Sequence, residues 1–268
     1  QNTAVNWLAY GAYFLVISVP TLIFIMGLSF LIMSIIRNQA VTFVVLLGYV
    51  AISLFYLQDK VYYLFDYMAF NIPLTFSDFV GFGNLETILI HRGMYLSLGI
   101  AFIFYTVLLL RRLPHSESMR IFSFLFGTIA LAGGIFLGSM HVGSFLKNQN
   151  LREEMISLND QYLDVKQLAI SNYDIQLNHQ GGTISCEATL DARNDANETL
   201  STVLFSLNPG LNLTRLTVNG KEQAFERKLG LVELTRLQVA PGEQLKLGFS
   251  YSGTINEAAC FLDIDDET

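Results

Sequence analysis

The chain has 268 residues, of which 52% are hydrophobic and 15% are charged, and its formal net charge is −7. Residues 1–150 carry seven Lys or Arg and five Asp or Glu (+2), whereas residues 151–268 carry nine and eighteen (−9). This asymmetry predicts a membrane-embedded part followed by an acidic soluble domain. The sequence has no basic cluster, so nucleic acid is not an expected partner.

Four apolar runs are long enough to cross a lipid bilayer, which requires about 20 helical residues. The predicted spans lie in a transmembrane region at 1–142, at about 19–36, 40–57, 93–110 and 121–140. These spans contain no Asp, Glu, Lys or Arg. A proton-relay pump would need ionisable groups inside them, so this absence argues against that class of protein.

The first apolar run begins at Trp7 and is too long for one straight span. At about 1.5 Å per residue, its length up to Ile36 exceeds a hydrocarbon core of roughly 30 Å. Pro20 lies in the middle of this run. We expect either a kink at Pro20 or an interfacial helix that leads into a span from about Val19.

Basic residues near the span ends predict the orientation in the membrane. Those that follow spans one and three are Arg37, Arg111, Arg112 and Arg120, against Lys60 and Arg92 after span two. The loop between spans three and four is therefore expected in the cytoplasm, and the 58–92 loop and everything after span four outside. We expect His91 and Arg92 to anchor the third span at the interface.

The 58–92 loop has two possible structures. Tyr63, Tyr67 and Phe70 fall on one helical stripe, and aromatic rings favour the membrane interface. A possible helix N-cap follows at Ser77 or Asp78. The segment is either a short interfacial or re-entrant helix pair, or a structured loop that lies over the bundle.

Gly134 and Gly138 in the fourth span have the small-xxx-small spacing that lets membrane helices approach closely. We favour a helix-packing role for them, within the bundle or in a helix–helix dimer. The alternative is that glycine is simply common in membrane helices.

The last part of the chain changes from helical to strand-like patterning. Residues 143–165 are polar with a loose apolar stripe, which predicts a helical connector. Residues 166–268 alternate apolar and polar residues between turn signals, and Asn219-Gly220 is a strong hairpin signal. The fold class is therefore mixed: a four-span α-helical bundle, then six to eight antiparallel strands that form a sandwich or saddle.

Neither a zinc-peptidase helix motif nor a nucleotide-binding P-loop occurs in the sequence. The four histidines, His91, His115, His141 and His179, are isolated in sequence and are not expected to bind metal. Cys186 and Cys260 both lie in the acidic part. Two separate buried thiols are favoured over a disulfide, which stays possible in an oxidising compartment.

The first 145 residues or so resemble permease subunits of type-2 ABC exporters, in particular long bacterial permeases. The similar stretches are "YFLVISVPTLIFIMGLSFLIMSIIRNQAVTF", "PLTFSDFVGFGN", "HRGMYLSLGI" and "RRL". The resemblance implies a translocation pathway in the lipid bilayer, driven by a separate ABC ATPase subunit that binds ATP.

The second part resembles the start of the aminopeptidase N-like zinc metallopeptidases. "YDIQLNH" corresponds to the strand that opens their first domain, and "GTISCEATL", "TVNGKE" and "LQVAPGEQLKLGFSYSG" follow in the family's order. The resemblance implies an incomplete N-terminal β-domain at 166–268. The zinc motif and the catalytic domain would lie beyond Thr268, so this chain is assigned no catalytic, cofactor-binding or metal-binding residue.

Together the resemblances imply a bacterial inner-membrane protein in which a permease is fused to an extracytoplasmic zinc aminopeptidase. The chain is expected to be an excerpt that spans the junction. One alternative is a membrane-anchored sensor or binding protein with an extracytoplasmic β-sandwich and no peptidase. Another is a permease part that has lost transport and only presents the peptidase.

Overall fold

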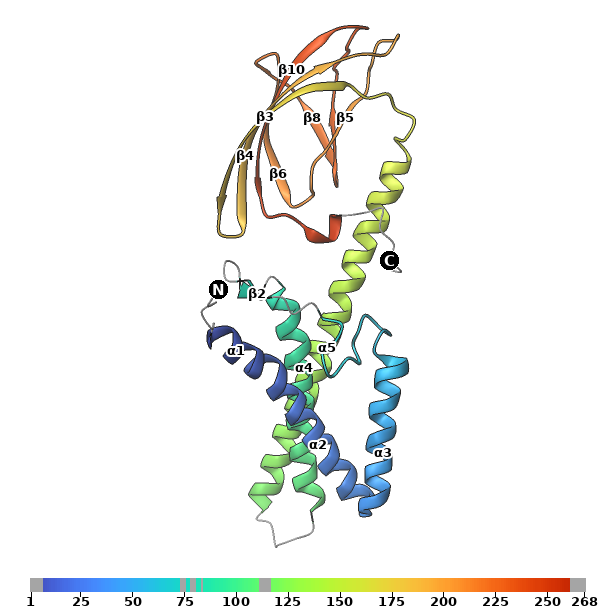
Figure 1. Ribbon diagram of the computed structural model, residues 1–268, viewed down its shortest axis with the longest axis vertical. Coiled ribbons are helices and arrows are strands. Elements are labelled where there is room, and N and C mark those ends of the chain that lie inside the picture. The colour runs from blue at the N-terminus through green and yellow to red at the C-terminus, as the bar shows by residue number, and fades with distance from the viewer. Residues whose placement is uncertain (1–6, 73–75, 78–80, 83, 111–116, 261–268) are drawn as a thin grey trace, which may run out of the picture. The chain divides into compact units, whose positions relative to one another are not determined.

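The computed structural model describes residues 7–72, 76–77, 81–82, 84–110 and 117–260 (Figure 1). They belong to two compact units that divide after Leu146, inside the expected connector. The first unit is mainly helical, and the second contains two antiparallel sheets. This order of helices followed by antiparallel sheets is the one that the sequence predicts.

The helical elements are long relative to the strands that lie among them. In chain order they are α1 Trp7–Tyr13, the π-helix η1 Phe14–Ser18, α2 Val19–Ile36, α3 Gln39–Ile52, the π-helix η2 Ser53–Leu57, α4 Leu85–Leu109 and α5 Glu117–Asp160. A two-residue ladder, β1 Phe76–Ser77 with β2 Gly81–Phe82, precedes α4. Ser77 thus lies in a strand, and Asp78 falls outside the described residues.

Within the described residues, four helical stretches are long and apolar enough to cross a membrane. They are Ala9–Ile36, Gln39–Leu57, Leu85–Leu109 and Glu117–Asp160, with mean hydropathies of 2.5, 2.3, 1.6 and 2.0. Their length and composition are consistent with membrane association. The third helix begins eight residues before the expected span and so contains His91 and Arg92.

The first helical run stays helical through Pro20. The π-helical turn η1 comes directly before α2, and Pro20 is among the first residues of α2. Proline has no N–H and its ring crowds the carbonyl four residues earlier, which here belongs to Val16 in η1. A wider π-helical turn at this point accommodates the crowding.

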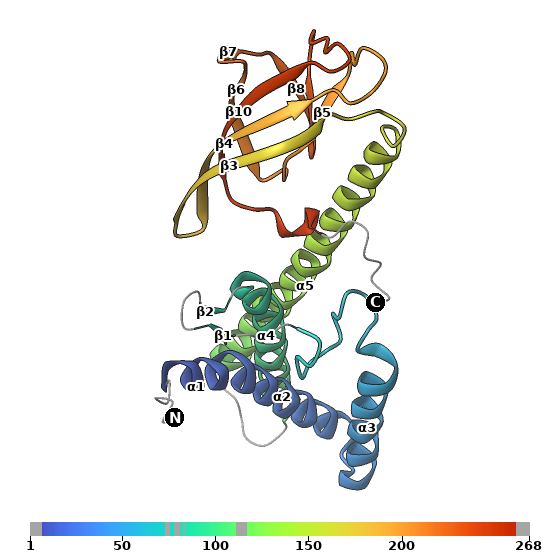
Figure 2. The ribbon, with the colours of Figure 1, turned by 45° about the horizontal axis from the view of Figure 1, so that its top comes forward.

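Helices α2 and α4 cross at a pair of glycines, Gly27 and Gly99 (Figure 2). A Cβ atom added to Gly99 would lie 2.7 Å from the backbone of Ile23 and of Phe24, and one added to Gly27 would meet the carbonyl of Gly99. The two helix backbones therefore touch without intervening side chains. Close approach of this kind is how small residues pack membrane helices.

An aromatic cluster fills the space beside this crossing. The Phe24 ring lies edge-on to Tyr95, with centroids 4.8 Å apart, and within 6.2 Å of the rings of Tyr49, Tyr67 and Phe102. Phe24, Tyr67 and Tyr95 are buried. Edge-to-face aromatic pairs add about 0.5–1.5 kcal/mol each beyond the burial of their area.

The loop after α3 folds into consecutive turns and contains no helix over residues 58–72. Val61, Tyr62, Tyr63 and Ala69 have left-handed backbone conformations, with φ between 53° and 60°. Residues in this conformation interrupt a helix, so the helix-pair interpretation is wrong for residues 58–72. The structured-loop interpretation is the correct one there.

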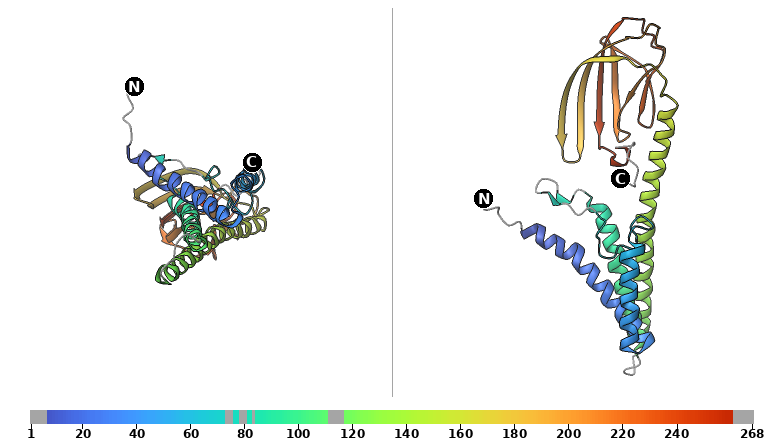
Figure 3. Two further views of the ribbon diagram at one scale, coloured as in Figure 1. Left: turned by 90° about the horizontal axis from the view of Figure 1, so that it is seen from below. Right: turned by 45° about the vertical axis from the view of Figure 1, so that its right-hand side comes forward.

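Helix α5 is continuous over 44 residues (Figure 3, right). It contains both the expected fourth span and most of the expected connector. The sequence from Met140 to Gly143 holds no proline, and a single glycine weakens a helix by only about 1 kcal/mol, so the helix does not end there.

The second unit contains two antiparallel sheets and a short 3-10 turn, η3 Glu257–Ala259. One sheet has the order β3-β4-β10-β6-β7, formed by Ala169–Gln180, Thr183–Arg193, Gln244–Gly253, Leu211–Val218 and Lys221–Glu222. The other has the order β5-β9-β8, formed by Val203–Ser206, Leu231–Leu234 and Phe225–Lys228. The β6–β7 hairpin turns at Asn219 and Gly220, whose φ angles of 50° and 80° confirm the predicted turn.

Both sheets contribute to one apolar core. Phe205 of β5 and Phe249 of β10 meet edge to face with centroids 5.0 Å apart, and Leu216, Leu234 and Leu247 are almost fully buried. The more specific description of this unit as a sandwich or saddle remains a prediction.

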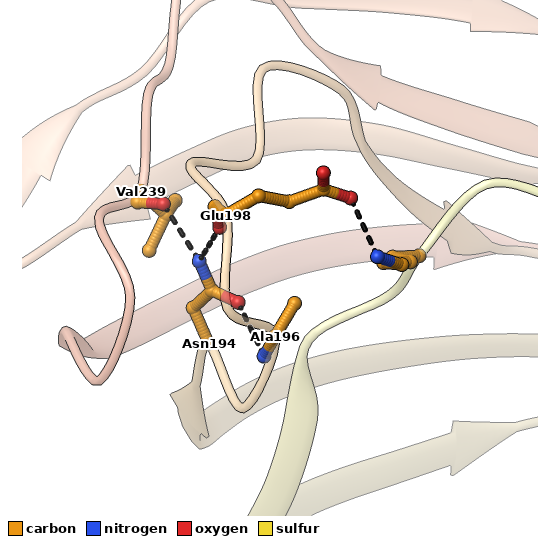
Figure 4. Close-up of polar contacts among 5 residues, drawn as sticks. Asn194, Ala196, Glu198 and Val239 are labelled. Atoms are coloured by element: carbon orange, nitrogen blue, oxygen red, sulfur yellow. Dashed lines mark hydrogen bonds and ion pairs between the residues drawn. The ribbon is translucent and has the colours of Figure 1, made fainter.

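Asn194 joins two loops at the end of β4 (Figure 4). Its side-chain amide donates to the carbonyls of Glu198 and Val239, at 2.9 and 2.8 Å, and its side-chain oxygen accepts from Ala196 N–H at 2.9 Å. The residue is fully buried. A buried amide that makes these three bonds fixes both loops, since losing it would leave their backbone groups without partners.

The contact at Gly99 predicts a sharp difference between two glycine substitutions. Gly99→Val places side-chain atoms where the α2 backbone lies, and we expect it to cost about 1–3 kcal/mol of stability. Gly48→Val in α3 is the matched control, because a Cβ there meets nothing within 4 Å. Thermal unfolding of the detergent-solubilised protein measures both. Equal melting temperatures would contradict the close crossing of α2 and α4.

Candidate functional site

A cluster of polar side chains is buried around Arg92 in the first unit. This Arg92 cluster consists of Thr21, Asp66, Tyr67, His91, Arg92 and His141. The side chains of His91, Arg92 and His141 are at most 1% exposed. His91 and Arg92 therefore do not anchor a span at the interface as expected; they lie inside the protein.

The Arg92 guanidinium binds the loop after α3. One terminal nitrogen donates to the Tyr67 carbonyl at 2.8 Å and to Thr21 Oγ1 at 3.0 Å. The other donates to the Asp66 carbonyl at 3.0 Å and to His91 Nδ1 at 3.0 Å. The guanidinium carbon also lies 5.1 Å from the centre of the Tyr95 ring, within cation–π range.

These contacts fix the tautomers of two histidines. Arginine can only donate, so His91 Nδ1 accepts, and His91 Nε2 carries the proton that it donates to the Tyr63 carbonyl at 3.1 Å. His141 Nε2 likewise donates to the Tyr62 carbonyl, at 2.9 Å. The two rings are 5.0 Å apart, although their residues are distant in sequence.

The Arg92 cluster acts as a clamp on the turns of the loop. Thr21 comes from α2, Arg92 from α4 and His141 from α5, and each of them has a hydrogen bond to a carbonyl in residues 62–67. Tyr95 adds another, to the Leu64 carbonyl at 2.7 Å. These carbonyls sit in turns, where they lack helical partners, so side-chain donors satisfy them.

A second candidate site, which we call the apolar groove, is a hollow of about 620 Å³ in the β-sheet unit. Its floor is formed by β3, β4 and β10, and the opposite wall by Phe205 and Val232 of the smaller sheet. Residues between α5 and β3, including Tyr162 and Leu168, complete the lining. Burial raises the pKa of Tyr251 in this groove to about 12, and the nearby Cys186 thiol adds to the shift, so the phenol stays neutral.

The predicted packing glycines both face α4. A Cβ on Gly134 would lie 2.8 Å from a methyl carbon of Leu98, and one on Gly138 would lie 3.0 Å from the sulfur of Met94. Both contacts fall within the first unit. A role of these glycines in a helix–helix dimer stays a prediction.

Neither the Arg92 cluster nor the Gly27–Gly99 contact was predicted from the sequence. The available signals were an arginine just outside an apolar run, one glycine in α2 and two glycines in α4. Both cysteines are free thiols; Cys186 is buried as predicted, whereas Cys260 is only half-buried. Across the described ranges, no three His, Cys, Asp or Glu side chains gather as a metal site requires. His115 lies outside those ranges.

Comparison with known proteins gives only weak structural neighbours. No family model matches the chain, and no curated protein matches it significantly. Among solved structures, an M1 zinc metallopeptidase from Deinococcus radiodurans is 28% identical, with a TM-score of 0.29. A two-domain M1 zinc metallopeptidase mutant bound to L-tryptophan is 27% identical, with a TM-score of 0.30. Each match covers 32% of this chain and 20% of the other, so the chain spans about a fifth of these neighbours.

The clamp at Arg92 predicts local opening of the loop when the guanidinium is removed. Arg92→Gln removes the guanidinium bonds to the Tyr67 and Asp66 carbonyls, which keep only Thr21 Oγ1 and the Ala69 N–H as donors, and each lost bond to a charged group costs up to about 1.5–3 kcal/mol. We expect hydrogen exchange of the amides of residues 61–72 to rise at least about tenfold, measured by mass spectrometry. Arg120→Gln on the exposed start of α5 is the control. Unchanged exchange in the Arg92 variant would contradict the clamp.

Proposed function

We propose that this chain joins a permease part of the type-2 ABC exporter kind to the non-catalytic N-terminal β-domain of an extracytoplasmic zinc aminopeptidase. The membrane part anchors the β-domain and contributes to a translocation pathway. The β-domain helps to wall the substrate cleft of a catalytic domain that lies outside this chain.

The observation that carries the proposal is the position of the peptidase-like motifs in one sheet. "YDIQLNH" lies in β3, "GTISCEATL" in β4, and "LKLGFSYSG" in β10, which is the next strand of the sheet. "TVNGKE" forms the β6–β7 hairpin, which completes the order β3-β4-β10-β6-β7. Motifs that are up to 80 residues apart in the sequence thus become neighbours, as they would if they specified one domain.

Helix α5 supports the membrane part of the proposal. At about 1.5 Å per residue, its 44 residues amount to about 66 Å, roughly twice the thickness of a hydrocarbon core. Its first half is apolar and its second half polar. One continuous helix is therefore long enough to cross the bilayer and leave it, and β3 begins nine residues after its end.

The chemistry of the proposed protein would come from groups outside this chain. Zinc would be held by the catalytic domain, and ATP would be hydrolysed by a separate ABC ATPase subunit. The chain itself supplies no residue to either site. The proposed location is the bacterial inner membrane, with the β-domain on the extracytoplasmic side, as the distribution of Lys and Arg predicts.

A second candidate function is favoured by the apolar groove. A groove of about 620 Å³ has the size of a small-molecule site and is lined mainly by apolar side chains. In this alternative the helices are an anchor, and the β-sheet unit is a ligand- or partner-binding module without a peptidase.

Aminopeptidase activity of the complete protein separates the two functions. We expect membranes that contain the protein to release N-terminal residues from fluorogenic peptides, to lose this activity with a chelator and to regain it with Zn²⁺. Asn194→Ala should lower the activity several-fold, because it frees two loops of the β-domain, whereas Asn178→Ala at an exposed position should not. No zinc-dependent release by the complete protein would reject the peptidase and leave the binding module.

A further inference from the structure

The two edges of the five-stranded sheet are very different. Strand β7 at one edge has two residues, Lys221 and Glu222, and both are charged and exposed. Strand β3 at the other edge has twelve residues, and in the described part of the chain it pairs only with β4. Short, charged edges resist pairing with other chains, and long, uncharged edges favour it.

Strand β3 also carries an exposed apolar stripe. Tyr173, Ile175 and Leu177 alternate along the strand and are 59%, 54% and 59% exposed. The strand contains one carboxylate, Asp174, and no Lys or Arg. The strand therefore lacks the Lys or Pro that commonly protects an exposed edge.

The stripe extends the buried face of the sheet. Ile175 lies opposite Ala188 of β4, which lies opposite Phe249 of β10. Ala188 and Phe249 are buried at 8% and 7%, whereas Ile175 is more than half exposed. The apolar face therefore continues past the part that the smaller sheet covers.

The β3–β4 turn determines which backbone groups of β3 are free. Gly181 and Gly182 form a two-residue turn, and the φ of +60° at Gly181 is typical of type II′. In such a hairpin the flanking residues, Gln180 and Thr183, exchange hydrogen bonds, and every second residue does so along the ladder. The backbone groups of the odd-numbered residues, from 173 to 179, therefore point away from β4.

We propose that β3 is a dimer interface, at which it pairs antiparallel with β3 of a second copy, centred on Ile175. The free backbone groups of Ile175 then bind those of the same residue in the second copy. Tyr173 then lies opposite Leu177 of the second copy, and Leu177 lies opposite Tyr173 of the second copy. All three apolar side chains acquire apolar neighbours, and a single sheet runs through both copies.

A second copy fits this edge because the strand is complementary to itself. In the proposed register Asp174 lies opposite Gln176, whose amide can donate to the carboxylate, and Asn172 lies opposite Asn178. A register centred on Asp174 would instead place two carboxylates side by side, which destabilises a strand pair. The row from Phe249 through Ala188 to Ile175 continues into the same row of the second copy, so the interface joins the apolar faces of both.

Cross-linking of the full chain tests the interface. Ile175→Cys places a thiol opposite its own copy, at about 5.5 Å between Cα atoms, within the range for a disulfide. We expect a covalent dimer on mild oxidation in membranes. Lys221→Cys on the β7 edge and the unmodified protein, which keeps the buried Cys186 and the half-buried Cys260, are the controls and should stay monomeric on denaturing gels.

A second experiment tests the register. Asn172→Cys and Asn178→Cys protomers, coexpressed, should cross-link with each other. Adding Ile175→Lys, which places a charge in the apolar stripe, should reduce this product to the level of the Lys221→Cys control. Gln176→Lys, on the opposite face of the same strand, should retain the product.

Three results would overturn the proposal. One is no cross-link through Ile175→Cys, whether the protein is then monomeric or dimeric through its helices. Another is a cross-link from Ile175→Cys to a different protein. The third is an Asn172→Cys to Asn178→Cys product that Ile175→Lys leaves unchanged. None of these results depends on peptidase activity, so the proposed function stands or falls separately.

Discussion

The arrangement of the first unit depends on one buried cation. Arg92 donates to carbonyls of a loop that has no regular secondary structure, and through Thr21 it joins that loop to α2. Taking a guanidinium out of water is unfavourable unless its donors are used, and here four contacts use both terminal nitrogens, whereas Nε is buried without a partner. The loop in turn contributes Tyr67 to the aromatic cluster at the α2–α4 crossing. Polar satisfaction and apolar packing therefore support each other at this point.

The second unit depends on the continuity of apolar rows across strands. Each row begins in the shared core and passes through β4 to β3, where the cover of the smaller sheet ends. The same face thus supplies a folded core, a groove and an exposed edge. A domain that is fully folded can in this way still present an apolar surface of defined register.

Local sequence signals predicted the elements that depend on neighbouring residues. Asn219-Gly220 specified its hairpin because only the turn itself needs positive φ. The role of Arg92 could not be predicted, because its partners Thr21 and Tyr67 are 71 and 25 residues away in the sequence. In addition, a predicted span is taken to end where a charged residue interrupts the apolar run, so Arg92 was placed outside the third span. The crossing at Gly27 and Gly99 was missed because the spacing rule looks for two glycines on one helix.

The continuity of α5 has a consequence for its backbone. The helix runs unbroken from its apolar half into its polar half, as far as Asp160. The backbone N–H and C=O groups between a candidate membrane span and the polar residues that follow it are therefore paired within the helix, and no side chain has to satisfy them where hydrocarbon would give way to water.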